Sequence, residues 1–525
     1  MLKKLLCSTL ISTALVGVAC AASVGTTILE IPVSQSSRSN SSISYHIDEQ
    51  GTVFGPQDYF VAENTVYLLD TAQNRILIYC NDTLSDTISI SDFSAIDLAG
   101  DQQSLYTIDS LLNLYRYDGS SFVLVSSFSP MFDESISNFQ ISNGFGYFYI
   151  SDSNHGTTYQ FKLPEQYTDQ LQITQTFDGY RLDDNTFYYM DYGDTEELFS
   201  KSGTLIVYHP SNDQTQRIPV SSDYYLGQVQ YLGETIDGYP MICVEEVTQD
   251  EDYKIKTAQS IRVMSDTGDT LSIYDVPKQT LYPNSSLTSF EGQIYQLSNL
   301  SSSIQLSILD MDHTYNTDSY QSPLTVYNAP IQDRESNQTS KAASITRSKI
   351  MSNAKSFHTS FTWTCSSKNI ADMKNYKKPR YIDGSGEYSC MPYCWGGSSS
   401  ISQFEKGLAD GGRAGNIYTK TSGHVSNTYG LDCSGYVTKC WGLSGHKGTG
   451  ELGDYATEIT ISNLQKGDIL NWAGHHVVLF ESKKNSSTLN LYECTTSNSY
   501  DRVSHTTRTL SNLEDYVPLR YNNVE

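Results

Sequence analysis

The sequence has little positive charge. Its 525 residues include 34 lysines and arginines against 59 aspartates and glutamates, which gives a formal net charge of −25 at pH 7. So acidic a chain is repelled by phosphate backbones, which argues against a nucleic-acid partner and against binding wall polyanions through net charge. Long apolar runs are also scarce. Beyond residue 22 none reaches the ~20 apolar residues that a membrane-spanning helix needs, so we expect no span in the mature chain.

Cysteine is present without a pattern that assigns it a role. Of the ten cysteines, two fall within the first 22 residues. Pairing of Cys390 with Cys394, or of Cys365 with Cys440, is compatible with the spacing, and free buried thiols are an equally good interpretation. The Cys-x-x-x-Cys spacing is weak evidence for zinc. We therefore predict neither a metal nor a cofactor.

The N-terminal residues have the pattern of a targeting segment. Two lysines at positions 3 and 4 precede an apolar run that ends in small residues at Ala22. This pattern predicts a signal peptide over residues 1–22, and with it a secreted protein that is extracellular or associated with the cell wall. An alternative is a lipoprotein acylated on Cys20. The Ser-rich stretch that follows predicts a spacer over residues 23–44.

The pattern of residues 45–325 predicts short strands rich in tyrosine, with almost no helical periodicity. Strand–turn–strand units recur, and their turn aspartates are 39, 43 and 39 residues apart. That interval is the length of a four-stranded propeller blade. The turn aspartates are Asp70, Asp109, Asp152 and Asp191. With two looser units further along, we predict a six-bladed β-propeller; a seven-bladed ring or two sandwiches are the alternatives.

The first and fourth units resemble the hairpins of six-bladed propellers of the NHL type. The sequence does not identify a ligand for this region. A glycan or a protein is a possible partner, but tyrosine is also a good strand former whose ring packs while its hydroxyl stays wet.

Residues 326–380 form a polar linker that contains one helical pattern. Ile350, Ala354, Phe357 and Phe361 recur at helical spacing. We expect a helix whose apolar side packs on the C-terminal domain.

A candidate nucleophile lies in the segment Asp432-Cys433-Ser434-Gly435, where a turn leads into a short predicted helix. A thiol at a helix N-terminus lies beside unpaired backbone N–H groups, which favour the thiolate. Together with a neighbouring imidazolium, this position lowers a cysteine pKa from about 8.5 to roughly 3.5–7.5. We therefore predict that Cys433 is a reactive nucleophile.

A base for that nucleophile is predicted in a β-hairpin. Residues 475–480 and 489–494 read as antiparallel strands joined by a polar turn. If Phe480 faces Leu489, then His476 faces Glu493, and this face lies over the Cys433 helix. His476 would then be the base and Glu493 its orienting carboxylate. Other registers would bring Cys494 opposite His476, or use His475 instead.

Four blocks resemble the NlpC (NlpC/p-sixty) family of cell-wall cysteine peptidases. They are Pro-Tyr-x-Trp-Gly-Gly at 392–397, Asp-Cys-Ser-Gly at 432–435, Gly-Asp-apolar at 467–469 and His-Val-x-apolar-aromatic at 476–480. The resemblance implies an α+β, papain-like catalytic domain over residues 381–525, so the whole chain is predicted to be multidomain. Family members usually carry His, Asn or Gln where this chain has Glu493.

The resemblance also implies a substrate, namely peptidoglycan stem peptides or muropeptides. The bond expected to be cut joins γ-D-glutamate to a diamino acid. Tyr393, Asp432 and Ser434 occupy the positions that read a free L-Ala amine in the family, and Trp395 is expected in the cleft. The glycine-containing insertion at 398–428 is expected to border the groove. The alternatives are another cysteine amidase or acyltransferase, and a propeller-led binding protein with an inactive C-terminal domain.

Overall fold

The computed structural model describes most of the chain. The described residues are 25–33, 43–47, 53–90, 93–101, 104–109, 112–128, 136–151, 155–168, 171–182, 185–193, 197–276, 278–279, 286–290, 293–309, 322–324, 344–496 and 500–525. The predicted signal peptide, residues 326–343 of the predicted linker and the turn aspartate Asp152 lie outside these residues.

The N-terminal part consists of six four-stranded antiparallel sheets. The first two sheets contain β4 (Pro56–Ala62), β5 (Thr65–Asp70), β6 (Arg75–Cys80) and β7 (Thr83–Ser89), then β8 (Ala95–Gly100), β9 (Leu105–Asp109), β10 (Asn113–Tyr117) and β11 (Phe122–Ser127). The next two contain β12 (Ile136–Ser142), β13 (Phe145–Ile150), β14 (Thr157–Lys162) and β15 (Ile173–Asp178), then β16 (Tyr180–Arg181), β17 (Phe187–Asp191), β18 (Ser202–His209) and β19 (Gln214–Ser221). The last two contain β20 (Tyr225–Glu234), β21 (Pro240–Gln249), β22 (Ile255–Met264) and β23 (Thr270–Val276), then β24 (Leu287–Phe290), β25 (Gln293–Asn299), β26 (Ser303–Leu309) and β1 (Gly25–Pro32). A short hairpin of β2 (His46–Ile47) and β3 (Val53–Phe54) links β1 to the first sheet.

The six sheets close into a ring. First strands of consecutive sheets contact each other, as β4 contacts β8 and β8 contacts β12. The first and sixth sheets share one buried cluster that includes Leu29, Tyr59 and Leu297. The predicted β-propeller is therefore confirmed, with six blades. Among the predicted turn aspartates, Asp70 binds the Nε of Arg75 at 2.9 Å, and Asp109 accepts the backbone N–H of Asn113 at 2.9 Å.

The spacer predicted over residues 23–44 is wrong for its first part. Residues Gly25–Pro32 form β1, which pairs antiparallel with β26 and completes the sixth blade. Leu29 and Ile31 are buried while Glu30 between them is exposed, which is the alternation of a half-buried strand. The ring is thus closed by a strand from the other end of the propeller sequence, which leaves this edge paired.

The C-terminal part combines helices with one six-stranded sheet of order β31-β36-β32-β33-β34-β35. Its helices are α1 (Arg347–Ser356), α2 (Ile401–Ala409) and α3 (Cys433–Cys440), with short 3₁₀ turns at Ser367–Ile370, Leu452–Tyr455, Ile461–Asn463 and Ser511–Leu513. The strands of the sheet are β31 (Ala456–Glu458), β32 (Ile469–Trp472), β33 (His476–Lys483), β34 (Thr488–Thr495), β35 (Arg502–Thr509) and β36 (Val517–Tyr521). Two small pairs are β27 (Thr362–Cys365) with β28 (Gly386–Ser389), and β29 (Arg413–Ala414) with β30 (Thr428–Tyr429). None of the helices in the described residues is long and apolar enough to cross a membrane.

The helix predicted from the apolar spacing is α1. Its N-cap, Thr346, accepts the backbone N–H of Lys349, and the helix buries Ile350 and Ala354 against the core that contains α3. The helix ends at Ser356, so Phe361 reaches the same core from the turn that follows and not from the helix.

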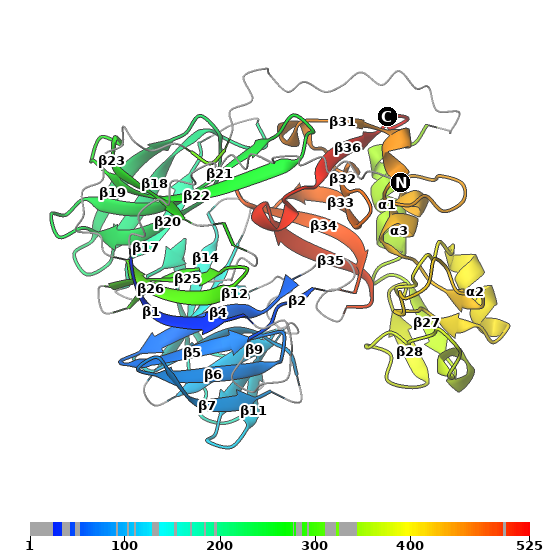
Figure 1. Ribbon diagram of the computed structural model, residues 1–525, viewed down its shortest axis with the longest axis horizontal. Coiled ribbons are helices and arrows are strands. Elements are labelled where there is room, and N and C mark those ends of the chain that lie inside the picture. Colours follow the sequence, from blue (N-terminus) through cyan, green and yellow to red (C-terminus); the bar gives the residue numbers. More distant parts are fainter. Residues whose placement is uncertain are drawn as a thin grey trace, which may run out of the picture.

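Both faces of the six-stranded sheet are buried. One face packs on α1 and α3, and the other packs on the propeller (Figure 1). The second core joins Phe199, Val247 and Ile255 of the propeller to Val478 and Phe480 of β33. The propeller therefore supplies part of the hydrophobic core of the C-terminal sheet.

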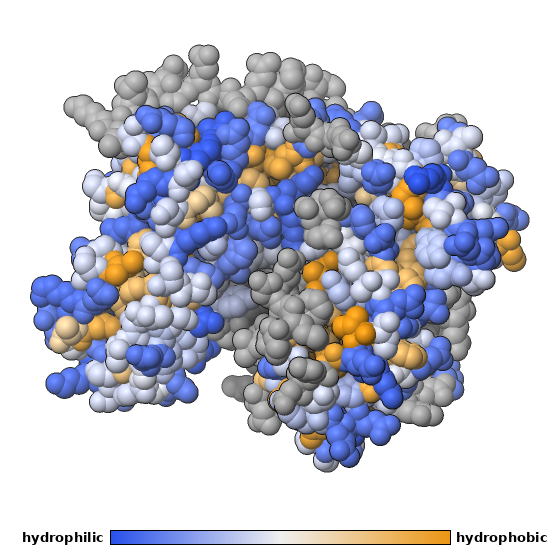
Figure 2. Space-filling model, turned by 180° about the vertical axis from the view of Figure 1, so that it is seen from behind, coloured by the Kyte–Doolittle hydropathy of each residue, from blue (hydrophilic) through white to orange (hydrophobic). Residues whose placement is uncertain are grey.

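Backbone hydrogen bonds extend this contact. The backbone N–H of Ile255, at the start of β22, donates to the carbonyl of Tyr516 at 3.0 Å. The side chain of Gln249 accepts the N–H of Ile461 at 2.8 Å and donates to the carbonyl of Ile459 at 3.3 Å. Seen from behind, the surface is mostly hydrophilic, with apolar residues in small separate groups (Figure 2). The apolar residues that join the two parts, such as Phe199 and Phe480, are buried.

A buried carboxyl at this interface predicts a pH-dependent stability. Burial raises the pKa of Glu245 from 4.5 to about 7, with Glu514 adding to the rise and the Gln228 N–H and the Ser511 hydroxyl opposing it. The folded chain then binds more protons than the unfolded chain between pH 4.5 and 7. The free energy of unfolding should therefore fall by about 3 kcal/mol as the pH rises through this window. Glu245→Gln should remove that fall.

Urea unfolding at pH 5 and at pH 8 measures this effect. Glu234→Gln is the control, because Glu234 is an exposed carboxylate in the same blade. An unchanged pH dependence in Glu245→Gln would show that this carboxyl is already ionised in the folded protein.

Candidate functional site

Cys433 is the first residue of α3, and two predicted blocks interlock around it. Asp432 is the N-cap, and its Oδ1 accepts the backbone N–H of Gly435 at 2.6 Å. The carbonyl of Gly397 accepts the Asp432 N–H at 3.0 Å. A Cβ on Gly435 would lie 2.1 Å from that same carbonyl, so only glycine fits this position. The Trp-Gly-Gly block thus packs directly on the turn that presents the thiol.

The ionisation of Cys433 differs from the prediction. The thiol is buried, and this burial, reinforced by the Asp432 carboxylate, raises the pKa of Cys433 well above its usual range. The N–H groups of Val477 and Ser434 oppose the rise without reversing it. The expected lowering by the helix N-terminus is therefore outweighed by desolvation. A thiolate here requires a base that accepts the proton.

His476 and Glu493 form a buried pair. His476 is the first residue of β33, and its Nε2 lies 2.7 Å from the Oε2 of Glu493 on β34. Because a carboxylate only accepts, Nε2 carries the proton and Nδ1 holds the free lone pair. Nδ1 is buried and has no hydrogen-bond partner among the described residues. The imidazole is therefore held in the tautomer that a base needs.

Glu493 is fixed as an anion. Although burial raises its pKa, Arg508 and the hydrogen bond from His476 outweigh burial and hold the pKa well below its usual range. The Nη2 of Arg508 donates to Oε2 at 2.7 Å, and the hydroxyl of Thr506 donates to Oε1 at 2.6 Å. Both partners come from β35. The structure thus adds Arg508 and Thr506 to the residues found from the sequence.

The thiol lies beside the start of β33. The backbone N–H of Val477, the residue after His476, is directed to the Cys433 sulfur. Cys433, Val477 and Leu479 also belong to one buried cluster. The structure therefore places the Cys433 sulfur beside the first residues of β33, the strand that begins with His476.

The predicted hairpin register is wrong in detail. Phe480 pairs with Leu491 and not with Leu489, and a bulge follows at Phe480/Ser482. Val478 and Phe480 face the propeller, whereas Val477 and Leu479 pack with the helices. Apolar residues occupy both faces of the strand, so alternation alone does not say which face meets the helix.

His475 and Cys494, the residues that other hairpin registers would have brought into the site, make other contacts. His475 is exposed at the hairpin turn, where its ring stacks on Trp472 with 4.2 Å between centroids. Cys494 donates its thiol to the carbonyl of Leu431 at 3.0 Å. All eight cysteines of the described residues are free thiols.

The predicted substrate residues lie around Cys433 but are mostly buried. Tyr393 is buried, and Trp395 is partly buried with its Nε1 donating to the carbonyl of Thr421 at 3.3 Å. Ser434 donates its hydroxyl to Oδ1 of Asp432 at 3.0 Å.

A second histidine, which the sequence did not indicate, contacts this group. Nε2 of His446 lies 3.0 Å from Oδ2 of Asp432. The hydrogen bond to Asp432 raises the pKa of His446, against the opposing effect of burial. His446 lies in a glycine-rich loop without periodicity, and only the fold brings it beside the nucleophile.

A groove opens near these residues, and most of its lining residues belong to the 398–428 insertion. It has a volume of about 420 Å³ and lies between α2 and the segment that leads into Cys433. Its lining residues are Gly396, Ser398, Ser399, Gln403, Lys406, Gly407, Asp410, His424, Thr428 and Tyr429. This volume falls in the usual range of small-ligand sites.

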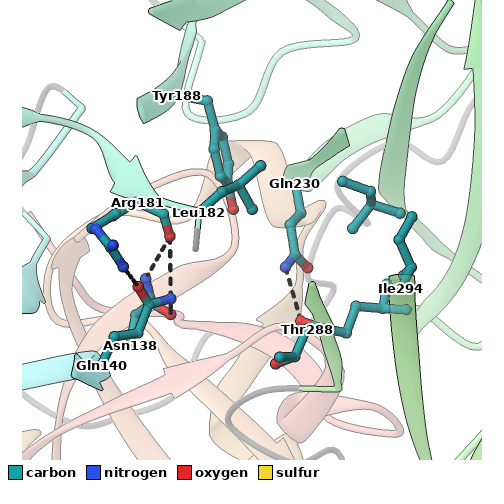
Figure 3. A pocket seen from close by; sticks show the side chains of 10 residues that line it. Asn138, Gln140, Arg181, Leu182, Tyr188, Gln230, Thr288 and Ile294 are labelled. Carbon is teal, nitrogen blue, oxygen red and sulfur yellow. Dashed lines mark hydrogen bonds between the residues drawn. The ribbon is translucent and has the colours of Figure 1, made fainter. Parts of the chain in front are cut away.

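The propeller has a much smaller cavity between the first strands of four blades. It measures about 30 Å³, far below the usual range of small-ligand sites. The guanidinium of Arg181 donates to Gln140 at 2.7 Å across it, and Gln230 donates to the carbonyl of Leu287 at 3.2 Å (Figure 3). This part of the propeller interior is filled by its own side chains.

Comparison with known proteins adds little about identity. No family model matches the sequence, and no curated protein matches it. Among solved structures, BamB from Moraxella catarrhalis is 10% identical, with 56% of this chain and 100% of that chain covered and a TM-score of 0.28. YCF48 from Cyanidioschyzon merolae is 10% identical, with 50% and 97% covered and a TM-score of 0.32. A protein of unknown function from Bacteroides thetaiotaomicron is 13% identical, with 54% and 75% covered and a TM-score of 0.31. At these scores the fold assignment depends on the sheet topology alone.

Proposed function

We propose that this protein is a secreted cysteine peptidase that cleaves peptidoglycan stem peptides. The observation that carries the proposal is the buried His476–Glu493 pair, whose free Nδ1 lies at the start of the strand that reaches the Cys433 sulfur. Nucleophile, base and orienting acid are the arrangement of nucleophilic acyl transfer.

The mechanism follows from the ionisation of these groups. Nδ1 of His476 takes the thiol proton as the sulfur attacks an amide carbonyl, and Glu493 stabilises the resulting imidazolium. The imidazolium then protonates the leaving amine, and water activated by the same ring releases the acyl group. A backbone N–H at the start of α3 would stabilise the oxyanion. Because the thiol pKa is raised, proton transfer to His476 is part of the reaction itself.

The substrate class comes from the resemblance to the NlpC family. It supports stem peptides or muropeptides as substrates, with cleavage between γ-D-glutamate and the diamino acid. The predicted signal peptide supports export, and lipoprotein anchoring through Cys20 is the alternative. The propeller buries one face of the catalytic sheet. It therefore has a structural role whether or not it also binds a glycan or a protein.

The proposal is tested by digesting purified peptidoglycan and defined muropeptides and identifying the products by mass spectrometry. We expect fragments cut after γ-D-glutamate, and we expect Cys433→Ala to abolish them. Cys440→Ala is the matched control, because Cys440 is a buried thiol at the other end of α3. Cleavage between sugar and peptide would identify an amidase instead. Unchanged hydrolysis by Cys433→Ala would refute the assignment.

A further inference from the structure

The carboxylate of Asp432, beside the proposed nucleophile, already has three hydrogen-bond partners. Its Oδ1 accepts the Gly435 N–H at 2.6 Å and the Ser434 hydroxyl at 3.0 Å, and Nε2 of His446 lies 3.0 Å from Oδ2. The side chain of Asp432 is only 9% exposed. A substrate ammonium that used this carboxylate would have to displace His446. The side chain that faces Oδ2 of Asp432 is therefore supplied by the chain itself, as the imidazole of His446.

The 420 Å³ groove adjoins this pair. The hydroxyl of Ser398, which lines the groove, donates to the carbonyl of Gly445 at 3.5 Å, and Gly445 directly precedes His446. Gly397, between the lining residues Gly396 and Ser398, binds the Asp432 N–H through its carbonyl. A substrate held at Cys433 can therefore extend past Asp432 and His446 into the groove.

The groove has an aromatic wall whose position is fixed. A Cβ on Gly407 would lie 2.5 Å from the ring of Tyr429, and one on Gly412 would lie 2.4 Å from it. Two glycines thus form a slot that seats this ring, and the half-buried Tyr429 lines the groove. Tyrosine presents an apolar face with a polar hydroxyl at its edge.

The remaining lining is polar with little net charge. Lys406 and Asp410 form an ion pair with 2.6 Å between Nζ and Oδ2, so their charges cancel. Gln403 uses its Oε1 to accept the Ser400 N–H at 2.8 Å, which leaves its two amide N–H groups for a ligand. The Ser399 hydroxyl accepts the Gly430 N–H at 3.2 Å and keeps its proton for a ligand, and the Ser398 oxygen, whose proton goes to Gly445, can accept. An aromatic wall with hydroxyl and amide groups suits a neutral ring that has one apolar face and many hydroxyls.

We propose that this groove binds a saccharide ring attached to the acyl side of the substrate. The inference rests on the proposed function and specifies its substrate: a stem peptide still joined to its sugar, instead of a trimmed peptide with a free L-Ala ammonium. It thereby departs from the reading of Asp432 and Ser434 that the family resemblance implies. His446 acts as a specificity residue because it occupies the carboxylate that an ammonium would need.

Two measurements on the full chain test the inference. The first compares kcat/KM for a disaccharide tetrapeptide and for the same tetrapeptide with a free amine. We expect the sugar-bearing substrate to be preferred at least about tenfold, which corresponds to ~1.4 kcal/mol. Gln403→Ala should lower only the value for the sugar-bearing substrate. Equal or better hydrolysis of the free peptide, or an equal loss on both substrates, would overturn the inference.

The second measurement does not depend on hydrolysis. Calorimetric titration of Cys433→Ala with the N-acetylglucosamine–N-acetylmuramic acid disaccharide should show binding that is lost when Gln403→Ala is added. Glu405→Ala is the matched control, since Glu405 is exposed on the same helix and does not line the groove. Absence of disaccharide binding would refute the saccharide site. Absence of hydrolysis on both substrates, with the disaccharide still bound, would refute the proposed function and leave the saccharide site standing.

Discussion

Glu493→Gln is expected to lower kcat for stem-peptide hydrolysis by roughly 10⁴-fold, the loss seen when the orienting acid of a catalytic triad becomes an amide. Arg508 donates to both carboxylate oxygens of Glu493, with Nε 3.1 Å from Oε1 and Nη2 2.7 Å from Oε2. In the variant, the amide oxygen would pair with Arg508, so the amide NH₂ would face Nε2 of His476. The imidazole proton would then move to Nδ1. A protonated Nδ1 cannot accept the proton of the Cys433 thiol.

The matched control for this variant is Glu481→Gln. Glu481 lies on β33 and its Oε2 is 2.7 Å from Nε2 of His505, so the change breaks a carboxylate–imidazole pair of the same kind outside the site. Steady-state kinetics should show an almost unchanged kcat for this control. A similar small effect of both substitutions would mean that Glu493 does not orient the base.

Phe199→Ala should destabilise the C-terminal sheet although Phe199 belongs to the propeller. Its side chain is 1% exposed and packs in the cluster with Leu489 and Phe480. Removing a buried phenyl ring from such a core costs about 3–5 kcal/mol of unfolding free energy. All four tryptophans of the chain lie between residues 363 and 472. Tryptophan fluorescence in a denaturant titration therefore follows the C-terminal part alone.

Phe148→Ala serves as the comparison. Phe148 is equally buried, in the core between the second and third blades, away from the sheet. We expect it to shift the fluorescence transition less than Phe199→Ala does. Should Phe199→Ala leave the transition in place, the propeller would not be part of the folding unit of the C-terminal domain.

The propeller was predictable because its signal is repeated. Each blade carries the same strand–turn–strand pattern, so errors in one unit are corrected by the others. β1 was missed because it lies outside the repeat, and its partner β26 is more than 270 residues away. The neighbouring Ser-rich segment indicated a spacer more strongly than the residues of β1 indicated a strand. Pairing over such a distance is decided by the closed ring and not by local sequence.

The candidate site could be predicted as a set of residues but not as a geometry. The sequence blocks indicated Cys433 and His476, the hairpin pairing indicated Glu493, and the structure brings His476 and Glu493 together. Val478 and Phe480 were predicted to face α3, but they pack on the propeller; the error arose because both faces of the strand are apolar. No sequence pattern indicated His446, because only the folded conformation of its loop brings it next to Asp432.

The effect of burial on the thiol was also beyond the sequence. A helix N-terminus favours a thiolate, but nothing in the residue pattern shows that the first turn of α3 is enclosed. Enclosure raises the pKa of Cys433, so the proposed reaction would depend on proton transfer to His476.

The rate at which iodoacetamide alkylates Cys433, followed by peptide mass spectrometry between pH 5 and pH 10, tests this dependence most directly. If His476 accepts the thiol proton, the wild-type protein should react readily near pH 7. In His476→Ala the rate should instead rise about tenfold per pH unit towards the alkaline end, because only the raised thiol pKa then limits the thiolate fraction. Identical pH profiles in the two proteins would contradict the pairing of Cys433 with His476.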